Sequence, residues 1–87
     1  MTYTLRFAAR AKKTFLKFPK TLQDRILRAL EPLKQTPRPR QAEKLSGREG
    51  LFRIRVGDYR VIYSVHDDEL LVLVVKIGHR GKVYRGH

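Results

Sequence analysis

The chain has 87 residues, of which 20 are Lys or Arg and 8 are Asp or Glu, so its formal net charge is +12 at pH 7. This length suits one small domain, and the 41% of hydrophobic residues favours a folded core over a disordered polycation. The absence of cysteine excludes disulfides, thiolate nucleophiles and cysteine-ligated metal centres. A positive surplus this large predicts an anionic partner, whether nucleic acid, anionic lipid or an acidic protein.

The sequence shows no segment for a membrane or for export. Its longest purely apolar run, Leu70 to Val75, is far shorter than the ~20 residues that cross a bilayer. No secretory hydrophobic stretch follows the basic side chains of the first twenty residues, so we interpret these residues as part of the fold. We therefore expect a protein without a membrane helix, located in the reducing cytoplasm.

The first half of the chain predicts one strand and two helices. Tyr3, Leu5 and Phe7 alternate with polar residues, as in a strand with one buried face. A helical stripe follows, made of Ala8, Ala11, Phe15 and Phe18. Pro19 ends this helix. A second helix is expected with a capping box of Thr21 and Asp24 and an apolar stripe of Leu22, Ile26, Ala29, Leu30 and Leu33.

The second half predicts strands. Residues 51–56 and 59–65 alternate on either side of Gly57-Asp58, a two-residue turn typical of a β-hairpin. Another turn is marked by Asp67-Asp68, and the apolar run 70–77 predicts a strand inside the sheet. Pro32 should loosen the end of the second helix, and residues 36–40, with two prolines, predict an extended connector.

These elements predict a single α+β domain spanning residues 1–87. Their order is strand, helix, helix and three strands, followed by a short C-terminal segment. We expect a mostly antiparallel four-stranded sheet packed by the helical hairpin.

The predicted hairpin brings arginines together. If Gly57 and Asp58 are its only loop residues, Arg55 lies directly opposite Arg60, and Arg53 shares their face. Like charges directly opposite each other destabilise a sheet, so this arrangement makes sense mainly if an anion lies between them. The planar guanidinium binds phosphate through two parallel hydrogen bonds. For any single arginine, a solvated strand face is the alternative interpretation.

The C-terminal segment carries further cations around one aromatic residue. Arg80, Lys82 and Arg85 surround Tyr84 with no acid among them. Aromatic and guanidinium groups together stack and clamp an unpaired nucleotide. A role for Tyr84 as a core aromatic is the alternative.

With these residues in place, the chain resembles toxins of the RelE/ParE superfamily of type II toxin–antitoxin pairs, and specifically the RelE branch. The resemblance covers nearly the whole chain. It is carried by KLSG at 44–47, LFRIRV at 51–56, GDYRVIY at 57–63, GHR at 78–80 and VY at 83–84.

The resemblance implies a ribosome-dependent endoribonuclease that cuts messenger RNA in the decoding site and is held inactive by an acidic, RelB-like antitoxin. Arg53 and Arg55 stand at two positions that are lysines in well-known members. Arg60 matches the phosphate-binding arginine, Arg80 the arginine near the leaving group, and Tyr84 the stacking or proton-handling tyrosine. A guanidinium keeps its proton, so Arg55 is a poor general base where a lysine serves better.

Cleavage by the 2′-hydroxyl of the RNA needs that group deprotonated, the phosphorane stabilised and the departing 5′-oxygen protonated. We expect no metal and no cofactor. Arginines stabilise the developing charge well and accept a proton poorly. His79, next to Arg80, is a candidate acid or base, and a surface polar residue is its alternative interpretation.

Two other functions fit the same sequence. A ParE-like toxin shares the fold and poisons DNA gyrase, although Arg80 and Tyr84 favour the nuclease. A nonenzymatic RNA-binding module would bind through positive charge and aromatics alone.

Overall fold

The computed structural model describes residues 2–45 and 50–79 as a five-stranded mixed sheet with helices. The strand order is β1-β5-β4-β3-β2, with β1 parallel to β5 and the other neighbours antiparallel. The elements are β1 (Thr4–Phe7), α1 (Ala9–Leu16), α2 (Lys20–Leu30), the 3-10 helix η1 (Glu31–Lys34), β2 (Glu43–Lys44), β3 (Leu51–Val56), β4 (Tyr59–His66) and β5 (Leu71–His79). The predicted α+β class and order are confirmed, but the sheet has one strand more than expected. β2 was missed because two residues are too few to show an alternating pattern.

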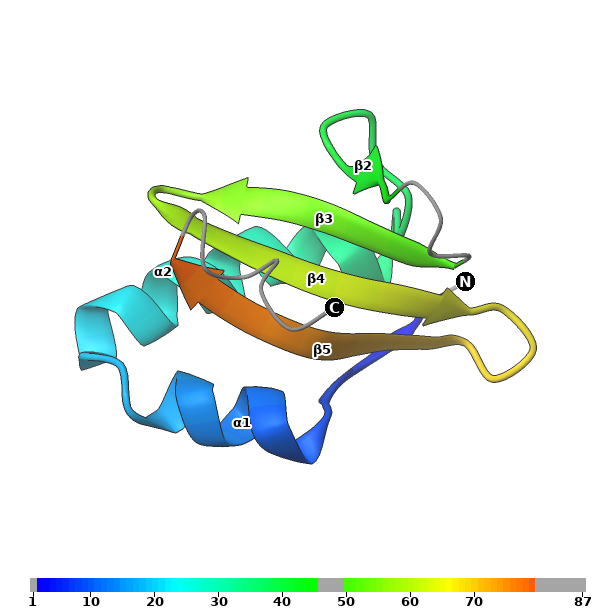
Figure 1. The fold of residues 1–87 in the computed structure, drawn as a ribbon. Coiled ribbons are helices and arrows are strands. Elements are labelled where there is room, and N and C mark those ends of the chain that lie inside the picture. Colours follow the sequence, from blue (N-terminus) through cyan, green and yellow to red (C-terminus); the bar gives the residue numbers. More distant parts are fainter. Residues whose placement is uncertain (1, 46–49, 80–87) are drawn as a thin grey trace.

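Both helices pack on the same side of the sheet, with α1 along β5 and α2 along β3 (Figure 1). Their apolar stripes meet the inward-facing residues of the three long strands. The resulting core consists of Ala11, Phe15, Ile26, Leu30, Leu33, Ile54, Val56, Val61, Tyr63, Val72, Val74 and Ile77. The strand residues that alternate with these core residues point to the sheet face opposite the helices.

The helix ends differ from the predicted ones at Pro19. α1 ends at Leu16 because the next two amides bond three residues back, in a 3-10 turn, instead of continuing the α-helix. Pro19 is the N-cap of α2, and its carbonyl accepts the amides of Leu22 and Gln23, both at 3.0 Å. The predicted capping box is therefore wrong. Thr21 lies inside the first turn and makes no capping bond.

β5 lies between β1 and β4, as predicted for the apolar run. Its pairing with β4 shifts by one residue, because Ile62 is opposite Lys76 while Tyr63 is opposite Val74. Val75 is the extra residue of this bulge. The shift lets Val74 and Ile77 both face the helices and places Lys76 on the opposite face.

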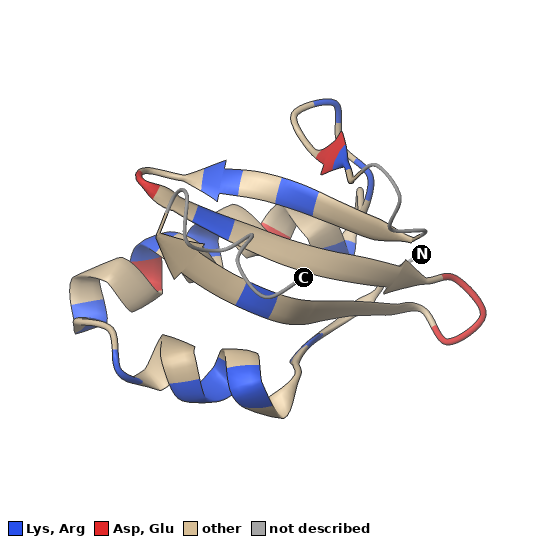
Figure 2. Ribbon diagram, viewed as in Figure 1, with Lys and Arg blue, Asp and Glu red and all other residues tan. Residues whose placement is uncertain are grey.

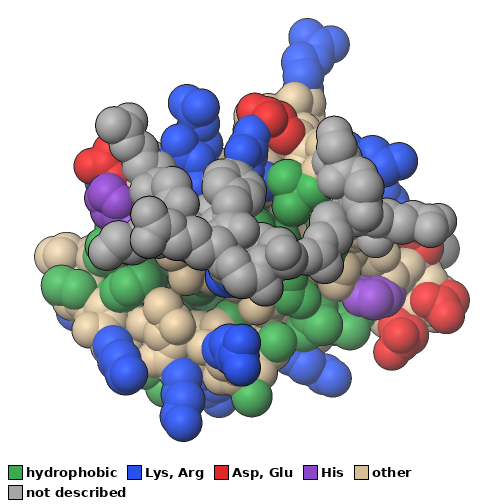
Figure 3. All heavy atoms as spheres, viewed as in Figure 1, with side chains coloured by type: hydrophobic (Ala, Val, Ile, Leu, Met, Phe, Trp, Pro, Cys, Tyr) green, Lys and Arg blue, Asp and Glu red, His purple; other side chains and the backbone are tan. Residues whose placement is uncertain are grey.

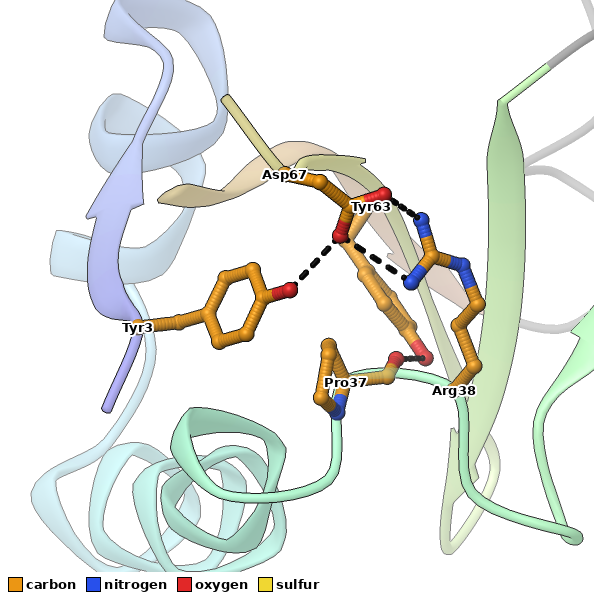
Figure 4. Close-up of polar contacts among 5 residues, drawn as sticks. All are labelled: Tyr3, Pro37, Arg38, Tyr63 and Asp67. Carbon is orange, nitrogen blue, oxygen red and sulfur yellow. Dashed lines mark hydrogen bonds and ion pairs between the residues drawn. The ribbon is translucent and has the colours of Figure 1, made fainter. Parts of the chain in front are cut away.

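A polar network ties the N-terminal strand and the connector to the β4–β5 turn (Figure 4). The Asp67 carboxylate accepts the hydroxyl of Tyr3 at 2.6 Å and two bonds from the Arg38 guanidinium, at 2.7 and 3.2 Å. Tyr63, buried beneath, donates its hydroxyl to the carbonyl of Pro37 at 2.8 Å. Residues 37–38 of the connector are thereby held against the sheet.

Neither helix in the described ranges is long and apolar enough to cross a membrane.

Candidate active site

The β3–β4 hairpin has the predicted turn and register. Gly57 and Asp58 connect the strands, and Gly57 has a φ of +61°, in the left-handed region that favours glycine. Arg55 is opposite Arg60, as predicted, and Arg53 is opposite Ile62. The face of these residues is set by alternation with Ile54, Val56 and Val61, which point into the helix-side core.

We call this surface the arginine face and define it by Glu43, Arg53, Arg55, Arg60, Ile62 and Lys76. The sheet register arranges it in two rows. The first row runs across four strands, from Glu43 through Arg53 and Ile62 to Lys76. The second runs from Arg55 through Arg60 to Gly78, which carries no side chain.

Four cations of the arginine face come from three neighbouring strands, visible as the blue bands on β3, β4 and β5 in Figure 2. Strands are ~4.8 Å apart and rows ~7 Å apart, so the Cα atoms of the four cations occupy roughly 10 by 7 Å. Long Lys and Arg side chains reach across that distance. The cluster can therefore meet one phosphodiester and its neighbours at the same time.

The members of the arginine face differ in exposure. Arg55 is exposed, whereas Arg60 is half-buried, with Nη1 placed 3.4 Å from the carbonyl oxygen of Tyr59. Arg53 forms an ion pair with Glu43 on β2, and their side chains are 19% and 62% exposed, respectively. The side chain of Arg53 is thus held against the sheet, whereas the carboxylate of Glu43 is mostly exposed to solvent.

Sequence reasoning missed the two other charged residues of this surface, Glu43 and Lys76. Lys76 had a signal, because it is the one charged residue in the apolar run 70–77. No sequence signal pointed to Glu43, because its position depends on the pairing of β2 with β3.

His79 does not join the arginine face. It is opposite Tyr59 in the register, and its ring centroid is 5.5 Å from that of Tyr59, with the planes at 85°. The Tyr59 ring is also 5.1 Å from the ring of Phe18, which follows α1. His79 therefore lies with the aromatic residues of the helix side. Arg80 and Tyr84 lie outside the described residues, so their place in the site stays a prediction.

Charge is unevenly distributed along the sheet. Asp67, Asp68 and Glu69 gather in the exposed β4–β5 turn, which Figure 3 shows as the acidic cluster at the right. Arg55 and Arg60 lie next to the β3–β4 turn, at the other end of β4. Phosphate oxygens are therefore attracted to the arginine face and repelled from the opposite end. Within the described ranges, no three His, Asp or Glu side chains are grouped so as to hold a metal ion.

Comparison with known families matches residues 5–84 to the ParE toxin of type II toxin–antitoxin systems. This chain belongs to the RelE/ParE toxin superfamily. Its relatives place this toxin in the RelE branch, as predicted. The mRNA interferase toxin RelE of Escherichia coli is 32% identical over 82 residues, which are 92% of this chain and 85% of the relative.

Solved structures support the same placement. The RelE chain of the archaeal RelE–RelB complex from Pyrococcus horikoshii superposes with a TM-score of 0.80 at 34% identity, covering 94% of this toxin and 99% of that chain. A chain of the intact Escherichia coli RelBE complex gives a TM-score of 0.82 at 28% identity, covering 92% and 99%. The toxin therefore has the RelE fold over nearly its whole length.

Proposed function

We propose that this toxin is a ribosome-dependent endoribonuclease that cleaves messenger RNA and so inhibits translation. The observation that carries the proposal is the direct pairing of Arg55 with Arg60 beside Arg53 and Lys76 on one face. Like charges directly opposite each other destabilise a sheet, so an anion bound between Arg55 and Arg60 would stabilise this pair. The name of the Escherichia coli relative, mRNA interferase toxin, supports RNA as this anion.

The proposed chemistry is attack of the RNA 2′-hydroxyl on the adjacent phosphorus. Arg55 and Arg60 bind the phosphoryl oxygens, and their fixed charge stabilises the phosphorane that forms. Lys76 adds a fourth charge from the neighbouring strand. By resemblance, Arg80 assists the leaving oxygen and Tyr84 stacks on a base. Neither metal nor cofactor is needed, because the charge stabilisation comes from side chains.

We infer dependence on the ribosome from the predominance of guanidinium groups on the arginine face. Guanidinium groups bind charge but do not accept protons at neutral pH. Alignment of the attacking and leaving oxygens then supplies much of the rate, and a ribosome that holds the RNA rigidly provides it. Ribosomes and mRNA are therefore its proposed targets, and the cytoplasm is its proposed location.

We further propose an acidic, RelB-like antitoxin as the partner that controls the toxin. The solved relatives from Pyrococcus horikoshii and Escherichia coli are complexes of RelE with RelB. The net charge of +12 favours a partner whose carboxylates meet the arginines. Binding there would exclude RNA.

The test is purified toxin incubated with a defined mRNA, either free or programmed in ribosomes, followed by mapping of new 5′ ends. We expect cuts only on ribosomes, and their loss in Arg60→Ala and Arg80→Ala, while both variants still bind antitoxin. Arg28→Ala, an exposed arginine of α2, is the matched control and should cut normally. Efficient cleavage of free mRNA, or full activity of both site variants, would overturn the proposal.

The match to ParE makes gyrase poisoning the second candidate. Induced cells separate the two: a nuclease stops protein synthesis first, whereas a gyrase poison first accumulates broken DNA. A binding module without activity would protect RNA and leave no new 5′ ends.

A further inference from the structure

The proposed reaction requires a group that removes the proton of the 2′-hydroxyl. Arg53, Arg55 and Arg60 cannot do so, because a guanidinium does not lose its proton in proteins. The ammonium of Lys76 only donates hydrogen bonds and has no acceptor atom. His79 lies on the helix side of the sheet, against Tyr59. Among the described residues of the arginine face, Glu43 supplies the one carboxylate.

The fold holds this carboxylate beside the proposed phosphate site. β2 is fixed at the edge of the sheet, because Glu43 is paired with Arg53 and the amide of Leu45 donates to the carbonyl of Leu51 at 3.0 Å. The ion pair is made through Oε2 of Glu43 and Nη2 of Arg53. Within the described residues, Oε1 of Glu43 has no hydrogen-bond partner, and the side chain is 62% exposed. One oxygen therefore orients the group, while the other is accessible to a substrate.

Resting on the proposed function, we propose that Glu43 is the general base of this toxin. Oε1 accepts the proton of the 2′-hydroxyl as the O2′–P bond forms. The P–O5′ bond breaks, and the departing 5′-oxygen takes a proton from water. The products are a 2′,3′-cyclic phosphate and a 5′-hydroxyl, and Glu43 then returns its proton to water.

Arg53 acts on this step as a positioning residue through its bond to Glu43. A guanidinium has five N–H donors, so the bond to Glu43 uses only part of its capacity. A simple structural role for the ion pair predicts a different outcome. If Glu43 only neutralised Arg53, its removal would strengthen phosphate binding and leave the rate equal or higher.

The experiment compares E43Q, E43D and wild-type toxin in single-turnover cleavage of ribosome-bound mRNA between pH 5.5 and 9, with ribosome affinity measured in parallel. Glutamine keeps an oxygen that accepts the Arg53 bond and removes the base. We expect E43Q to cleave on the order of 100-fold more slowly or worse, the lower part of the range for general base catalysis, with ribosome affinity within about twofold of wild type. E43D should keep part of the activity.

Glu31→Gln is the matched control, because Glu31 is an exposed carboxylate of η1 that pairs with Lys34 at 3.1 Å on the helix side. It should cleave as wild type does. An E43Q rate equal to or above that of wild type overturns the role of Glu43 while leaving the nuclease proposal intact. Absence of cleavage by the wild-type toxin overturns the proposed function itself.

Discussion

The guanidinium of Arg25, on α2, lies against the backbone of Gly57 in the β3–β4 turn. Three of its atoms are 3.1–3.2 Å from the point that a Cβ on Gly57 would occupy. The helix layer therefore touches the turn that sets Arg55 opposite Arg60. A side chain at Gly57 would have to displace this guanidinium and also adopt a left-handed backbone.

Gly57→Ala should destabilise the toxin by about 1–2 kcal/mol, the cost of a left-handed conformation in a residue with a Cβ. We also expect weaker cleavage, because the turn holds the two arginines in register. Urea unfolding and the ribosome cleavage assay measure the two effects.

Gly50→Ala is the control for that variant. Gly50 also has a positive φ, of +78°, but among the described residues no atom beyond its chain neighbours lies within 4 Å of its would-be Cβ. It should lose a similar stability and keep its cleavage rate. Equal activity of the two variants would contradict a role for the turn in the site.

Lys76→Ala should weaken cleavage and reduce the salt dependence of RNA binding. Loss of one phosphate contact lowers the slope of log affinity against log salt by about 0.7 for single-stranded RNA. Lys76→Arg should restore the slope, since it keeps the charge. Lys34→Ala, which removes a lysine of η1, is the control. A slope unchanged in Lys76→Ala would remove Lys76 from the phosphate site.

Tyr63→Phe should change how stability depends on alkaline pH. Burial raises the pKa of Tyr63 to about 12, above the ordinary value of about 10. A raised folded-state pKa stabilises the fold below pH 10, and that contribution is lost as the pH rises from 10 to 12. At pH 7 the variant should be about 1 kcal/mol less stable than wild type, because it lacks the bond to Pro37. This difference should shrink above pH 10 and reverse in sign by pH 12, because the pKa difference then outweighs the lost bond. Unfolding curves that stay parallel over that pH range would contradict this.

Asp67→Asn should affect stability in the acid range. The hydrogen bonds from Arg38 and then from Tyr3 lower the pKa of Asp67. Its contribution is therefore present above the ordinary pKa of about 3.9 and is lost as the pH falls through the lower folded-state value. The gap between wild type and variant, measured by urea unfolding, should narrow as the pH falls below the ordinary value of about 3.9. Glu69→Gln, in the same turn, provides the comparison.

Local chemistry was enough to predict the hairpin and its arginine pair. Gly57-Asp58 between two alternating segments fixes both the turn and the register, so the pairing of Arg55 with Arg60 followed from sequence. The start of α2 was not predicted correctly from the sequence, because Pro19 occupies the N-cap position that was expected for Thr21.

The remaining features of the site depend on pairing between segments. Glu43 lies beside Arg53 only because β2 pairs with β3. The two residues of β2 are too few to show the alternating pattern of a strand. His79 was expected near the arginines from its place in the chain. Its side of the sheet is decided by the register of β4 with β5, which the bulge at Val75 shifts.

In an unbroken strand, Val74 and Ile77 would point to opposite faces, because they are three residues apart. The extra residue, Val75, corrects this phase and turns the side chain of Lys76 toward the arginine face. A chain lacking Val75 would carry the same side chains to the same faces in regular β geometry. Deletion of Val75 should therefore be better tolerated than insertion of one residue elsewhere in β5. Such an insertion would move the buried side chains that follow it to the opposite face of the sheet.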